Sequence, residues 1–109
     1  MEPVDIERKL EEAFDAFYGL QGEHRLLGEE AAVAKATYER EYAHALLTAR
    51  DKGLAVEVAK AEAQVKAADS YQRMLVADAV HRANRSAIAV LTTQVDILRS
   101  LSASHRSVF

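Results

Sequence analysis

The sequence has no cysteine, no tryptophan, a single proline and only four glycines among its 109 residues. Without cysteine the chain cannot form a disulfide, a thiolate zinc site or a cysteine nucleophile. No apolar run approaches the ~18 residues of a membrane span. The first twelve residues are acidic, where a secretory signal would be basic. We therefore expect a cytoplasmic protein that makes no contact with a membrane.

Aromatic residues are also scarce, at 6% of the chain, whereas half of the residues are hydrophobic. Much of that half is alanine, which occurs 21 times. Alanine has a high helix propensity and lets helix axes approach closely. It buries only a methyl group, so at ~25 cal/mol per Å² an alanine stripe stabilises less than a leucine stripe. The composition predicts helices that share a thin apolar contact.

Apolar residues recur at spacings of three and four from Ile6 to Leu20, which predicts a first helix over residues 4–18. Gly19, Gly22 and Gly28 follow, and each costs a helix interior up to ~1 kcal/mol relative to alanine. We therefore expect a kink or break over residues 19–28.

The helical pattern returns over residues 29–50 and is followed by a turn at 51–53, where Gly53 suits the left-handed conformation that ends a helix. A long helix is expected over 54–102, with a frayed tail at 103–109. The arms on either side of Gly53 have similar lengths, which favours a long antiparallel helical hairpin, coiled-coil-like, in a single all-α domain over residues 1–109. Two such helices leave much apolar surface in water, so a homo-oligomer is expected.

The predicted helix or oligomer seam consists of large residues at helical spacing, namely Tyr38, Tyr42, Asn84, Ile88, Leu91, Val95 and Leu98. Asn84 is the polar member of this set. Two interpretations stay open: a buried asparagine that fixes register or subunit number, or a partly exposed one at the edge of the seam.

Two segments have the carboxylate-x-x-His spacing of di-iron bundles, Glu41 to His44 and Asp78 to His81. A fold at Gly53 would separate them by several helical turns, so we expect no metal site and no cofactor. No glycine-rich phosphate loop and no nucleophile arrangement is present either. The sequence does not predict an enzyme.

Charge is distributed unevenly, because residues 1–30 carry nine acids and three bases while residues 71–109 carry five bases and two acids. Basic side chains on an exposed helix face can neutralise phosphates without reading sequence, and Tyr71 could stack on a base. Alternatively, the acidic and basic ends lie together and neutralise each other.

Three segments are informative in another way, namely residues 71–73 (YQR), residues 95–106 (VDILRSLSASHR) and residues 42–47 (YAHALL) before the glycine turn. Together they resemble segments of small helical phage proteins of the UvsY type. Proteins of that type are recombination mediators, which help to load a phage recombinase onto single-stranded DNA in the bacterial host cell. The resemblance implies an oligomer of long helices with single-stranded DNA and a recombinase as partners. The candidates for phosphate contact are Lys60, Lys66, Arg82, Arg85, Arg99 and Arg106. The alternative function is a non-enzymatic adaptor, or a host-targeting phage factor, that binds a protein through a helical face.

Overall fold

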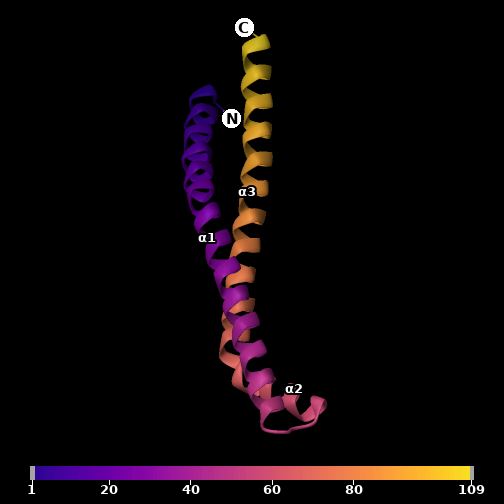
Figure 1. Ribbon diagram of the computed structural model, residues 1–109. Helices are drawn as coiled ribbons and strands as arrows, with labels where there is room; N and C mark the ends of the chain where they lie inside the picture. The colour runs from indigo at the N-terminus through magenta and orange to yellow at the C-terminus, as the bar shows by residue number, and fades with distance from the viewer. Residues whose placement is uncertain (1, 109) are drawn as a thin grey trace. The chain divides into compact units, whose positions relative to one another are not determined.

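The computed structural model describes residues 2–108, which form three α-helices and contain no strand (Figure 1). Helix α1 spans Pro3–Asp51, α2 spans Val56–Lys66 and α3 spans Ala68–Val108. The prediction of an all-α helical hairpin is confirmed. Contacts divide the helical chain into two units. Unit 1 joins the residues up to Leu26 with those from Arg82 onward, and unit 2 comprises Leu27–His81.

In unit 1 the first half of α1 lies antiparallel to the second half of α3. Phe14 of α1 lies under the guanidinium of Arg99, whereas Leu20, further along α1, accepts a hydrogen bond from Asn84, which comes earlier in α3. The largest fully buried side chain of the described residues is Ile6, which is 1% exposed. Large aliphatic side chains and one asparagine therefore fill this contact.

In unit 2 the second half of α1 pairs with α2 and the start of α3. Tyr38 of α1 lies against Tyr71 of α3, with ring centroids 5.1 Å apart. The side chains that are buried here are all small, namely Ala45, Ala49, Ala59, Ala63, Ala67 and Ser70. The thin methyl-lined contact predicted from composition is found in this unit.

The predicted turn is confirmed at Gly53, which has φ +88°. Its N–H donates to the Arg50 carbonyl (2.9 Å), and the N–H of Leu54 donates to the Ala49 carbonyl (3.3 Å). These are the two bonds of a Schellman motif, which satisfies carbonyls at the end of α1.

Of the kink or break expected at residues 19–28, the break is absent, because α1 is continuous through all three glycines. Tertiary contact outweighs their low propensity. Leu20 and His24 are half-buried against α3. A Cβ on Gly28 would lie 3.2 Å from Nε2 of His81, so this glycine makes room for an imidazole.

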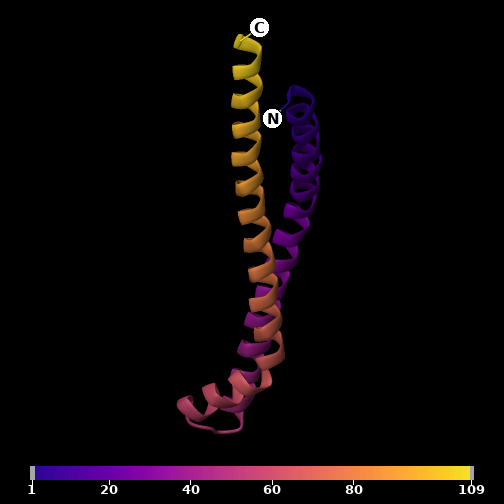
Figure 2. The same ribbon diagram turned by 180° about the vertical axis from the view of Figure 1, so that it is seen from behind.

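The long helix expected over residues 54–102 is instead two helices that meet at Ala67, whose φ and ψ are −95° and 9°. Backbone hydrogen bonding is kept on both sides, since the Ala67 N–H donates to Ala63 and the Tyr71 N–H donates to Ala67. In unit 2, α2 turns away from the start of α3 (Figures 1 and 2). The bend leaves Ala59, Ala63 and Ala67 with no exposed surface.

The end of α3 also differs from the expectation, because the helix passes Ser102 and continues to Val108. His105 is half-buried and lines a small groove together with Pro3 and Ile6 of α1. Packing against the first turn of α1 thus extends the helix into the segment predicted to fray; Phe109 lies outside the described residues.

Candidate nucleic-acid interface

The six basic residues predicted to contact phosphates fall into two groups. Lys60 and Lys66 lie on α2 in unit 2. The other four lie on α3 in unit 1, namely Arg82, Arg85, Arg99 and Arg106. All six are exposed. They therefore supply two candidate surfaces, which differ in their surroundings.

The lysines of α2 are each beside a glutamate of the same helix. Nζ of Lys60 lies 3.7 Å from the Glu57 carboxylate, and Nζ of Lys66 lies 3.1 Å from that of Glu62. Exposed pairs of this kind contribute at most about 1 kcal/mol, so a phosphate could compete for the lysines. The neighbouring carboxylates nevertheless leave α2 without a positive surface.

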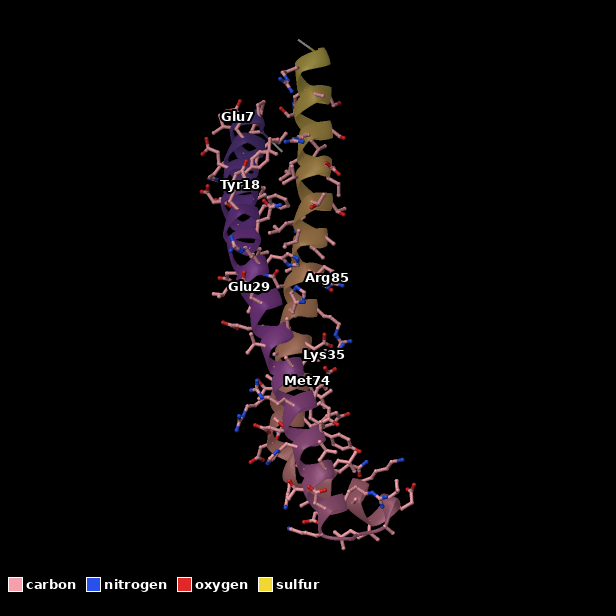
Figure 3. All side chains as sticks on the ribbon, viewed as in Figure 1. Glu7, Tyr18, Glu29, Lys35, Met74 and Arg85 are labelled. Atoms are coloured by element: carbon pink, nitrogen blue, oxygen red, sulfur yellow. The ribbon has the colours of Figure 1, made fainter. Side chains whose placement is uncertain are left out.

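The arginines of unit 1 share one side of α3, which we call the arginine face. At 3.6 residues per turn, positions 82, 85, 99 and 106 fall within about 120° of the helix circumference. Asp96 is the one acid among residues 82–108 of α3, and it falls within the same arc. Figure 3 shows Arg85 projecting outward from α3. Four positive charges against one negative charge make this the basic side of α3 in unit 1.

An aromatic groove lies beside the arginine face. Phe14, Phe17 and Tyr18 of α1 line it, together with Thr92, Val95, Asp96 and Arg99 of α3, and its volume is about 230 Å³. The Arg99 guanidinium carbon is 5.2 Å from the centroid of the Phe14 ring. Tyr18 packs its ring 6.3 Å from that of Phe14 and 6.0 Å from that of Phe17, yet remains 65% exposed. The groove thus combines an exposed ring with a cation held over a second ring.

Sequence reasoning missed these three aromatic residues as site candidates. Of the three, only Phe17 belongs to the apolar positions that predict the first helix. Tyr71, which was proposed as the stacking residue, lies in unit 2 and is 45% exposed. It contacts Tyr38, whose ring centroid is also 6.0 Å from that of Tyr42.

The remaining predicted seam residues lie in the contact of α3 with α1 in unit 1. Asn84 is 6% exposed. It is therefore a buried asparagine, and not a partly exposed one at the edge of the seam. Its amide nitrogen donates to the Leu20 carbonyl (3.2 Å), and its amide oxygen is 3.0 Å from Nδ1 of His24. Since that oxygen can only accept, Nδ1 of His24 carries the hydrogen. Val95 is buried, and Ile88, Leu91 and Leu98 are half-buried.

The described part of the chain contains no cluster of histidine and carboxylate side chains that could hold a metal ion. Glu41 and His44 are both exposed on α1. Asp78 and His81 lie on α3, and His81 packs against Gly28. The two carboxylate-x-x-His segments therefore do not combine into one site.

Comparison of the chain with protein-family models, with curated proteins and with solved structures gave no match. Over the described residues, none of the three helices has an apolar stretch long enough to cross a membrane. The function is therefore inferred from the surfaces of the two units.

Proposed function

We propose that this protein is a non-enzymatic accessory protein that binds single-stranded DNA through the arginine face and the aromatic groove of unit 1. The observation that carries the proposal is the position of Arg99, which belongs to both features. A strand whose phosphates lie along the arginines has the exposed ring of Tyr18 within reach of its bases. This combination of a cationic track with stacking rings is typical of binding without sequence preference.

The dimensions suit a strand rather than a small ligand. Arg85 and Arg106 are 21 positions apart on α3, which corresponds to about 32 Å of helix. Exposed acidic side chains lie near the start of α1, namely Glu7, Glu11, Glu12 and Asp15. They repel phosphate, so the phosphates should follow α3 and only bases should reach Tyr18, which shares its side of α1 with Glu11 and Asp15.

The resemblance to UvsY-type proteins supports a more specific role as a recombination mediator. In that role the protein would hold the phosphate backbone and present the strand to a recombinase, with no bond made or broken. The setting implied by the resemblance is the cytoplasm of a phage-infected bacterium, with the recombinase as the protein partner.

The test is a titration of fluorescent oligonucleotide at low salt and again at ~200 mM, because phosphate binding weakens as counterions compete. The double variant Arg85→Ala/Arg99→Ala should weaken binding and lower the salt slope by about 1.4, which is ~0.7 for each lost phosphate contact on a single strand. Tyr18→Ala should weaken binding with the salt slope unchanged.

The matched control is Lys60→Ala/Lys66→Ala, which removes the same charge from unit 2. We expect a smaller loss there, because Glu57 and Glu62 already offset these lysines. Equal losses for the two double variants would reject the arginine face as the binding surface. Absence of oligonucleotide binding at low salt would reject DNA binding altogether.

The second candidate function is an adaptor that binds another protein through a helical face. It is favoured by large apolar side chains exposed in unit 2, where Val33 and Leu47 of α1 are each 65% exposed and Val65 of α2 is 76% exposed. If the protein does not bind oligonucleotide at low salt, we would assign it to the protein-binding adaptors.

A further inference from the structure

Helix α3 carries two apolar stripes in unit 1, and α1 covers only one of them. The inner stripe faces α1 and consists of Asn84, Ile88, Leu91, Val95 and Leu98. The outer stripe is displaced from it by one residue and consists of Ala83, Ala87, Val90, Gln94, Ile97 and Leu101. Its spacing alternates strictly between four and three, which is the repeat of a coiled-coil seam.

The outer stripe is open to solvent. Val90 is 58% exposed, Ile97 is 55% exposed and Leu101 is 39% exposed. Gln94, Ile97 and Leu101 also line a groove of about 490 Å³, whose α1 wall consists of the small residues Ala13 and Ala16 with Lys9 and Glu12 beside them. A helix could approach closely along this wall.

The stripe holds no charged residue from Ala83 to Leu101. The charged residues of α3 over the same length are Arg85, Asp96 and Arg99, and all three lie within the arc of the arginine face. A stripe without cationic side chains cannot neutralise a phosphate backbone. We therefore expect its partner to present an apolar surface as well. A helix with a matching stripe fits this chemistry.

The order of small and large residues identifies the partner. Reading along the stripe, the small residues Ala83 and Ala87 come first, and the large residues Ile97 and Leu101 come last. We propose that the outer stripe packs against the outer stripe of a second copy of this chain, antiparallel, about a two-fold axis at the level of Thr92.

In this arrangement Ala83 lies opposite Leu101 of the second copy, Ala87 opposite Ile97, and Val90 opposite Gln94. Every small residue therefore meets a large one, and the knobs of one helix fill the holes of the other. A parallel pair would instead set Ala87 against Ala87 and Ile97 against Ile97, leaving a void at one end and crowding at the other. The two-fold arrangement is also isologous, as in most homodimers.

Pairing through the outer stripe is independent of DNA binding. On α3 the arginine face is centred on the side opposite the outer stripe, so the paired helices leave the arginines exposed. Self-association and DNA binding therefore have separate readouts, and either can fail without the other.

The first test is sedimentation of the full chain at micromolar concentration. The wild-type chain should sediment as a dimer. Ile97→Glu should raise the dissociation constant by on the order of 100-fold, because it buries a carboxylate beside an alanine. The control is Val33→Glu, a similarly exposed position in unit 2, which should leave the dimer intact. A monomeric wild type, or equal effects of the two variants, would overturn the proposal.

A rescue experiment tests the antiparallel order. Ala87→Lys should weaken the dimer, and the double variant Ala87→Lys/Ile97→Glu should recover it, because the introduced lysine of one copy then faces the introduced glutamate of the other. Positions 87 and 97 are about 15 Å apart on one helix, so the rescue cannot arise within a chain. A double variant weaker than both single variants would indicate parallel helices and reject the proposed order.

The absence of native cysteine allows an independent check. Single variants Ala87→Cys and Ile97→Cys, mixed and oxidised, should form a disulfide between different variants and none within either alone. In the antiparallel dimer the two copies of position 87 are about 15 Å apart along the axis, beyond the ~7 Å Cα separation that a disulfide can span. A disulfide between two copies of the Ala87→Cys variant would overturn the proposal, as would the capture of a different protein with no self-association.

Discussion

Unit 1 and unit 2 share the long helices α1 and α3, and unit 2 also contains α2, but the two units bury different side chains. Unit 1 buries Ile6, Val95 and Asn84 together with one alanine, Ala13, whereas the buried positions of unit 2 are five alanines and a serine. A contact filled by large side chains loses most when one is shortened. A contact lined by methyl groups brings the helix axes close and loses most when one is enlarged. The two units should therefore respond in opposite ways to substitution.

The largest expected effect is enlargement in unit 2. Ala63→Leu should lower the free energy of unfolding by about 3 kcal/mol, because Ala63 has no exposed surface and a larger side chain has no space there. The control is Ala61→Leu on the exposed side of α2, which should change stability by less than ~0.5 kcal/mol. Urea denaturation followed by far-UV circular dichroism measures both. Similar values for the two variants would show that α2 is not packed as described.

Truncation in unit 1 should have the next largest effect. Ile6→Ala should cost about 2 kcal/mol, since Ile6 is 1% exposed and its removal leaves a cavity. Val4→Ala, on a side chain that is 72% exposed, serves as the control and should be close to neutral. The comparison fails if both variants unfold at the same denaturant concentration.

The polar contact of unit 1 should show coupling of about 1 kcal/mol between His24 and Asn84 in a double-mutant cycle with alanine. Each single variant removes the hydrogen bond between Nδ1 of His24 and the Asn84 amide oxygen. Asn84→Ala also releases the Leu20 carbonyl, so it should be the more destabilising of the two. Additive effects would mean that this bond contributes nothing to stability.

Glycine substitutions should give the smallest effects, with opposite signs. Gly53→Ala should destabilise by about 1 kcal/mol, because φ +88° is unfavourable for alanine. Gly22→Ala should stabilise by up to ~1 kcal/mol, since it lies inside α1 and an added Cβ meets no atom within 4 Å. Thermal unfolding compares the two, and a loss of stability in Gly22→Ala would point to strain in that part of α1.

The sequence predicted those structural features that depend only on neighbouring residues of the chain. Gly53 ends α1 through its own backbone conformation, so the turn was visible without the fold. The continuity of α1 through Gly19, Gly22 and Gly28 could not be predicted in this way, because contacts with α3 outweigh the propensity of the glycines. The bend at Ala67 was missed for a related reason: neither glycine nor proline marks it, and burial of the alanine face of α2 decides its position.

The candidate site was predicted in part. Charge identified the four arginines of α3 in unit 1, but it ranked Lys60 and Lys66 equally with them, because the carboxylates one turn away were not considered. Of the groove's three aromatic residues, sequence periodicity placed only Phe17 on the apolar face, and it could not show that Phe14 and Tyr18 lie beside Arg99. Pairing the two helices was necessary to show which ring remains exposed.

The hydrogen bond from Asn84 to the Leu20 carbonyl fixes the register in which α1 and α3 pair in unit 1. A slip of one heptad would bring Leu91 to Leu20 and leave the buried amide without a partner. The alignment of α1 with α3 in unit 1 is thus encoded far from the connecting turn. Two peptides obtained by severing the backbone at Gly53 should therefore complement each other in the native alignment when mixed.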